Sequence, residues 1–137
     1  MLAHAMIPLA LCASLAAAAA LPLYADTPLS GAEFDAFATG KTLYFSAGGA
    51  PYGAEEYLPD QRVRWAFEGD ECITGQWYEQ AGQICFTYDN GLGPQCWYFY
   101  ANGTSLTAKL AGDAAGQSYQ ARPGSQPLFC PGPKIGV

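Results

Sequence analysis

The most constraining feature of this sequence is a series of short segments in which apolar and polar residues alternate, separated by turn-forming residues. Six such segments follow residue 40: "KTLYFS", "RVRWAF", "GQWYE", "QICFTY", "QCWYFYA" and "TSLTAKL". A period of two places every second side chain on one face of a strand, and short spacings favour antiparallel neighbours. The chain is therefore predicted to be mainly β, an antiparallel meander or small barrel of about six to seven strands.

One short N-terminal helix is predicted before the first strand. In "PLSGAEFDAFATGK", Ser30 is placed as the N-cap, and Glu33 three residues later completes a capping box. Leu29 is placed to pack on Phe34, and Gly40 ends the helix. This helix is expected to cover one end of the curled sheet.

The dipeptide Asn102-Gly103 favours a two-residue hairpin turn of type I′. That turn would place Phe99 opposite Leu106 on the neighbouring strand. Applying the same alternation upstream predicts one apolar, core-facing side of the sheet. Its residues are Leu43, Phe45, Val63, Trp65, Phe67, Trp77, Ile84, Phe86, Tyr88, Trp97, Phe99, Leu106, Ala108 and Leu110.

The first 25 residues have the pattern of a secretory signal peptide. The apolar run from Ile7 to Ala20 is too short to span a bilayer, and small residues lead to a predicted cleavage after Ala25. Residues 26–137 would then form a single domain, without a later apolar run long enough for a membrane span. The expected location is periplasmic or extracellular.

Four of the five cysteines lie after residue 25, and an even number in an exported chain predicts two disulfides. Cys85 and Cys96 alternate with core residues on consecutive strands, so they are predicted to bond on the outer face. Cys72 would then bond Cys130 and fix the C-terminal segment, although other pairings stay open from the sequence. A zinc site is disfavoured because no C-x-x-C pair occurs.

Charge and motif content exclude several classes of function. The net charge is −6, and the six basic residues are not clustered, which argues against a nucleic-acid partner. The single histidine, His4, lies in the predicted signal peptide, so histidine-dependent triads and metal sites are not expected. No nucleotide-binding motif occurs. No catalytic residue, metal ligand or cofactor is predicted.

The face opposite the predicted core carries tyrosine and arginine side chains, a combination that suits binding surfaces. The candidate binding residues are Tyr44, Arg62, Arg64, Tyr78, Tyr98 and Tyr100. These residues would engage a protein partner in the cell envelope. In the alternative interpretation, they only stabilise the exposed side of the sheet.

Two acidic clusters and one long connection suggest other functions. Glu55, Glu56 and Asp60 lie in "PYGAEEYLPD", which is expected to be a loop between the first two predicted strands, and "FEGDEC" holds a second cluster. Paired carboxylates are the chemistry of a glycoside hydrolase. A connection of this length could also close over a small apolar ligand, as in a lipocalin-like carrier.

The run "GDECITGQWYEQAGQICFTYDNGLGPQCWYFYANG" resembles that of small exported bacterial proteins with a one-domain β-meander, over roughly residues 62–110. The chain is also similar in size, disulfides and strand content to small periplasmic lysozyme inhibitors. These resemblances imply a fold and no active residue. The preferred prediction is a non-enzymatic binding or inhibitor-like module that uses the tyrosine and arginine face. A carrier of a small apolar ligand and a carboxylate-dependent hydrolase are the alternatives.

Overall fold

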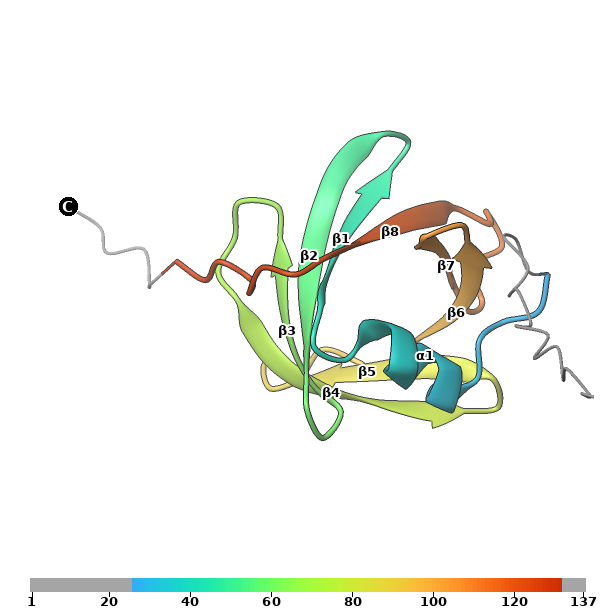
Figure 1. Ribbon diagram of the computed structural model, residues 1–137, viewed down its shortest axis with the longest axis horizontal. Helices are drawn as coiled ribbons and strands as arrows, with labels where there is room; N and C mark the ends of the chain where they lie inside the picture. Colours follow the sequence, from blue (N-terminus) through green and yellow to red (C-terminus); the bar gives the residue numbers. More distant parts are fainter. Residues whose placement is uncertain (1–25, 132–137) are drawn as a thin grey trace, which may run out of the picture.

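The computed structural model describes residues 26–131 and contains an antiparallel eight-stranded barrel with one short helix (Figure 1). The elements are α1 (Gly31–Ala38), β1 (Thr42–Ala47), β2 (Ala50–Leu58), β3 (Arg62–Phe67), β4 (Ile73–Gln80), β5 (Gln83–Tyr88), β6 (Gln95–Asn102), β7 (Ser105–Leu110) and β8 (Ser118–Gly124). The mainly β class and the single helix confirm the prediction. The predicted signal peptide, residues 1–25, lies outside the described residues.

Each strand pairs with the next along the chain, and β8 pairs with β1 to close the barrel. The predicted number of strands, six to seven, is too low, because two of the eight strands were missed. Gly48 and Gly49 have φ of 56° and 82° and form the tight turn between β1 and β2. The segment "PYGAEEYL", predicted to be a loop, is therefore strand β2. The other missed strand is β8.

Helix α1 lies within the ring of strands in Figure 1 and covers one end of the barrel. Its N-terminus has the predicted capping box, in which Ser30 Oγ accepts from the Glu33 amide and Glu33 accepts from the Ser30 amide. Phe34 is fully buried, with its ring centroid 4.6 Å from that of Phe99 and 5.3 Å from that of Trp77. The helix therefore completes the core at this end.

The core lies inside the barrel and is built mainly from the predicted face of the sheet. Besides Phe34, it includes three residues outside the predicted core face: Ala38 from α1, Tyr57 from β2 and Ala121 from β8. The predicted β6–β7 register is wrong by two residues, since Phe99 lies opposite Ala108 and not Leu106. Gly103 alone has positive φ at this turn, as a type II′ turn requires. A shift of two residues leaves every side chain on its predicted face.

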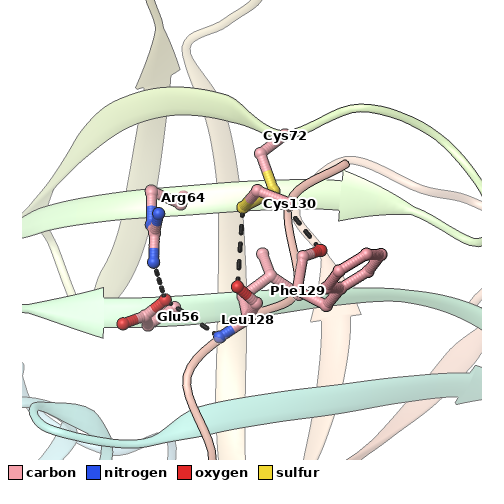
Figure 2. The surroundings of a disulfide bond; sticks show 6 residues. All are labelled: Glu56, Arg64, Cys72, Leu128, Phe129 and Cys130. Carbon is pink, nitrogen blue, oxygen red and sulfur yellow. Dashed lines mark hydrogen bonds and ion pairs between the residues drawn. A yellow bond between two sulfur atoms is a disulfide. The ribbon is translucent and has the colours of Figure 1, made fainter. Parts of the chain in front are cut away.

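The two disulfides are Cys85–Cys96 and Cys72–Cys130, as predicted. Cys85 and Cys96 are directly opposite on β5 and β6, with Cα atoms 3.9 Å apart. Cys130 attaches the segment after β8, which runs along the outside of the barrel past Glu56 (Figure 2). Within residues 26–131 no helix is long and apolar enough to cross a membrane.

Candidate functional site

The barrel interior contains a cavity on the far side of the core from α1. Tyr57 and Phe99 line it and also contact Phe34, so they separate the cavity from the helix. The space open to the centre of a water molecule is about 70 Å³. This space is enough for several waters or one small organic molecule. The lining residues are Phe45, Tyr52, Glu55, Tyr57, Trp65, Phe67, Ile73, Phe86, Tyr88, Leu92, Gln95, Trp97, Phe99 and Tyr119.

The rim of this barrel cavity is partly open to solvent. Phe67 is 39% exposed and Leu92 is 48% exposed. Tyr52 lies beside Phe67, with ring centroids 5.6 Å apart, and also contacts Tyr119 of β8. The β1–β2 register shifts next to Tyr52, because Phe45 pairs with Gly53 and Ser46 pairs with Pro51. This irregularity gives Tyr52 no partner on β1, which is how a bulge redirects a side chain.

Two glycines make room for the aromatic walls of the cavity. A Cβ atom on Gly53 would lie 2.6 Å from the Trp65 ring. A Cβ atom on Gly75 would lie 2.7 Å from the Tyr88 ring. Neither glycine has positive φ, so close approach explains both. Glycine at these positions lets atoms of the Trp65 and Tyr88 rings approach the backbone of the neighbouring strand closely.

Glu55 is the polar centre of the cavity. It lies on β2 between Leu43 of β1 and Trp65 of β3, and it is only 2% exposed. The Tyr88 hydroxyl donates a hydrogen bond of 2.6 Å to Glu55 Oε2. Among the residues described, Glu55 is the only charged type that lines the cavity.

Burial raises the pKa of Glu55 from 4.5 to about 7, because desolvation disfavours the carboxylate. Tyr88 and Tyr57 oppose this rise through hydrogen bonding. The pKa of the Tyr88 hydroxyl is itself raised, first by burial and then by the nearby Glu55 charge. Near neutral pH Glu55 is therefore divided between the neutral acid and the carboxylate, while Tyr88 keeps its proton.

The Tyr57 hydroxyl adds a second polar group at this point. It lies near enough to lower the pKa of Glu55, and Tyr57 is fully buried. No group within residues 26–131 gives this hydroxyl a hydrogen bond of ordinary geometry. A buried hydroxyl normally has a partner, and the Tyr57 proton is the group that acts on Glu55, so the hydroxyl oxygen is left as an acceptor beside Glu55. The arrangement suits a small ligand with one polar end.

The six predicted binding residues alternate with core residues and so lie on the outer side of the sheet, but they do not form one continuous surface. Tyr44 lies on β1, Arg62 and Arg64 on β3, Tyr78 on β4, and Tyr98 and Tyr100 on β6. These strands are distributed around the closed barrel. The structure does bring Tyr78 next to Cys85, its cross-strand partner.

Most of these six side chains have intramolecular partners. Arg64 pairs with Glu56, and Glu56 also accepts from the Leu128 amide, so the ion pair is linked to the C-terminal segment (Figure 2). The Tyr98 hydroxyl accepts from the Gln83 side chain. The Tyr44 ring lies 5.8 Å from the Arg122 guanidinium, and the Tyr100 ring lies 5.6 Å from Lys109 Nζ.

The first predicted acidic cluster is not assembled in the structure. Glu55 points into the barrel, whereas its neighbour Glu56 lies on the outer side beside Arg64. Among residues 26–131 no group of three or more acidic, cysteine or histidine side chains is placed to hold a metal ion. Sequence reasoning named Glu55 only as a loop carboxylate of this cluster. It missed the buried position of Glu55 because it assigned the segment "PYGAEEYLPD" to a loop. The Gly48-Gly49 pair, followed by alternation through Gly53, Glu55 and Tyr57, is the signal that could have found it.

Comparisons with known proteins do not add a function. No family model matches the chain, and no curated protein or solved structure matches it either. What the barrel does has to be inferred from its own cavity and surface.

Proposed function

We propose that this protein is an exported, non-enzymatic barrel that binds and carries a small, largely apolar molecule in the barrel cavity. One observation supports this most strongly. The cavity is concave, lined by aromatic rings and polar at one buried point, which is the usual construction of a small-ligand site. The outer face has no comparable cluster of aromatic and polar side chains, because its candidate tyrosines and arginines are distributed over four strands.

The rings around the cavity support each other as a rigid wall. Trp65 contacts Phe45, Tyr52 and Phe67, with centroid distances between 5.2 and 5.8 Å. Trp97 contacts Tyr119 at 5.3 Å. A wall with its rings already in contact loses little side-chain entropy on binding, which favours affinity. The ligand should contain about ten non-hydrogen atoms or fewer, given the available space.

Export to the periplasm or the outside of the cell is part of the proposal. It is supported by the two disulfides, since such bonds persist in oxidising compartments. The apolar N-terminal sequence supports it as well. The resemblance to small exported bacterial β-meander proteins is consistent with this location and carries no active residue.

Recognition of an envelope protein through the outer face is a second proposal, favoured by one place on the barrel. Tyr78 is 36% exposed and pairs with Cys85, and Tyr98 follows Cys96 by two residues. The disulfide and these two rings therefore lie close together on neighbouring strands. Replacing Tyr98 and Tyr100 by Ser should abolish capture of a protein partner, and unchanged capture would contradict this second proposal.

Native mass spectrometry of the protein taken from its own secretory compartment tests the first proposal. We expect a stoichiometric small-molecule adduct on the doubly oxidised domain. The variant Ile73→Trp should lose the adduct, because a larger side chain at this lining position fills the cavity. The variant Tyr98→Ser, on the outer wall, should keep it. An adduct that survives Ile73→Trp, or a protein with no adduct, would contradict cavity binding.

A further inference from the structure

We propose that the ligand of the barrel cavity is a small organic cation, an ammonium group on an aromatic or other apolar body, which pairs with the Glu55 carboxylate. This inference rests on the proposed function, because it names the chemical class of the molecule bound at the same site. It follows from the charge, the ring content and the hydrogen-bonding groups around Glu55.

Glu55 has no basic side chain beside it among the described residues. Glu55 is 2% exposed, and within residues 26–131 no Lys or Arg lines the cavity around it. The described basic residues are engaged elsewhere: Lys41 donates to the Phe37 carbonyl, Arg62 to the Pro59 carbonyl and Arg64 to Glu56, while Lys109 and Arg122 lie over tyrosine rings. A buried carboxylate without a cation is unfavourable, and a cationic ligand would supply the missing partner.

Aromatic side chains surround Glu55 in the cavity. Trp65, Trp97, Tyr52 and Tyr88 line the same cavity as Glu55. The faces of these rings carry partial negative charge and attract cations, most strongly where water is excluded. A neutral ligand could make the apolar contacts and a hydrogen bond, but it would gain nothing from the negative charge of the rings and the carboxylate. An anionic ligand would be repelled by both the rings and the carboxylate.

The polar atoms around Glu55 are arranged to accept hydrogen bonds from a ligand. Tyr88 donates to one oxygen of Glu55, which leaves acceptor capacity on the carboxylate for an ammonium N–H. The Tyr57 hydroxyl, which acts on Glu55 but makes no hydrogen bond of ordinary geometry within the described residues, has an oxygen that can accept a second ammonium N–H. Three donors on a primary ammonium match these acceptors better than a single hydroxyl does.

Binding should depend on pH in a defined direction. The titratable groups that face Glu55 are Tyr57 on its own strand and Tyr88 on β5, with Tyr52 beside Tyr88, and all three stay neutral below pH 9. Only Glu55 therefore titrates near pH 7, while an alkylammonium keeps its proton there as lysine does. Affinity for the cation should rise about tenfold between pH 6 and pH 8, since the ionised fraction rises by that factor.

Isothermal titration calorimetry with a matched pair of probes tests this inference. Benzylamine and benzyl alcohol have the same ring and the same number of non-hydrogen atoms, and both suit the size of the cavity. At pH 8 the wild-type protein should bind benzylamine at least tenfold more tightly than benzyl alcohol. At pH 6 the binding of benzylamine should release nearly one proton to the buffer, and benzyl alcohol should release none.

Two carboxylate variants make the test specific. Glu55→Gln keeps the shape of the side chain and should bring the two affinities together. Glu79→Gln, which removes an exposed carboxylate on β4, should keep the wild-type preference. Equal affinities in the wild type would overturn the cation assignment but leave the small-ligand proposal standing. Failure of both probes to bind would overturn both, and loss of the preference in Glu79→Gln would also overturn the assignment.

Discussion

Replacing Glu55 by Gln should change how the stability of the barrel depends on pH. Glu55 is fully buried, with its carboxyl facing rings and two tyrosine hydroxyls. Its pKa rises from 4.5 in a solvated chain to about 7 in the folded barrel. The folded state therefore binds a proton more tightly than the unfolded state over this interval.

The sign and size of the effect follow from proton linkage. Below pH 4.5 the carboxyl group is protonated in both the folded and the unfolded state, so its raised pKa does not lower the free energy of unfolding. As pH rises from 4.5 to about 7, the unfolded state ionises while the folded state does not, and the free energy of unfolding falls. The full loss corresponds to about 3 kcal/mol. Between pH 5 and pH 8 most of that loss, about 2 to 3 kcal/mol, should be visible. Gln cannot ionise, so the variant should lack this component.

Urea unfolding of the oxidised protein at pH 5 and pH 8 measures the difference. The wild type should lose about 2 to 3 kcal/mol more than Glu55→Gln over this range. Glu79→Gln serves as the control because Glu79 is exposed on β4. This variant should show the same change in the free energy of unfolding between pH 5 and pH 8 as the wild type. The same pH dependence in the wild type and in Glu55→Gln would refute the assignment of a buried, protonated Glu55.

Three further variants test the parts of the barrel that form the site. Phe34→Ala should destabilise the fold by about 3 to 5 kcal/mol, because it leaves a cavity between α1 and the core. A loss of stability below about 1 kcal/mol in urea unfolding would show that the helix is not part of the core. Gly53→Ala should displace the Trp65 ring, which would change the tryptophan fluorescence and weaken the binding of benzylamine. An unchanged fluorescence spectrum would contradict the close approach of Trp65 to Gly53. The double variant Cys72→Ser with Cys130→Ser should lower the free energy of unfolding by roughly 4 kcal/mol, from a separation of 58 residues. Wild-type stability of that variant would contradict this role of the bond.

The sequence was sufficient to predict the helix, the faces of six strands and both disulfides. These features depend on local signals such as the Ser30 to Glu33 capping box and on strict alternation around Cys85 and Cys96. The β6–β7 register was wrong because Asn102-Gly103 favours a type I′ turn. In the barrel the Asn102 side chain instead donates to Thr107 and Gln120 within the sheet, so Asn102 stays in the strand.

The candidate site was not predicted because it depends on β2, which was assigned to a loop. Residues 50–58 contain Gly53 and two adjacent glutamates, a composition typical of loops. Gly53 is required by the Trp65 ring across the strand, and Glu55 is buried by contacts from β1, β3 and β5. None of these neighbours is close in sequence. Long-range contacts of this kind are what a local pattern leaves out.

Cation binding in the barrel cavity requires a Glu55 side chain that titrates near neutral pH while buried. Carbon-13 NMR of the Glu55 carboxyl group, titrated between pH 3 and pH 9 with and without benzylamine, measures its charge state directly. The predicted midpoint is near pH 7 in the free protein and lower with benzylamine bound, since a cation stabilises the carboxylate. A midpoint near 4.5 that benzylamine does not change would contradict both the buried acid and its role as the ligand's partner.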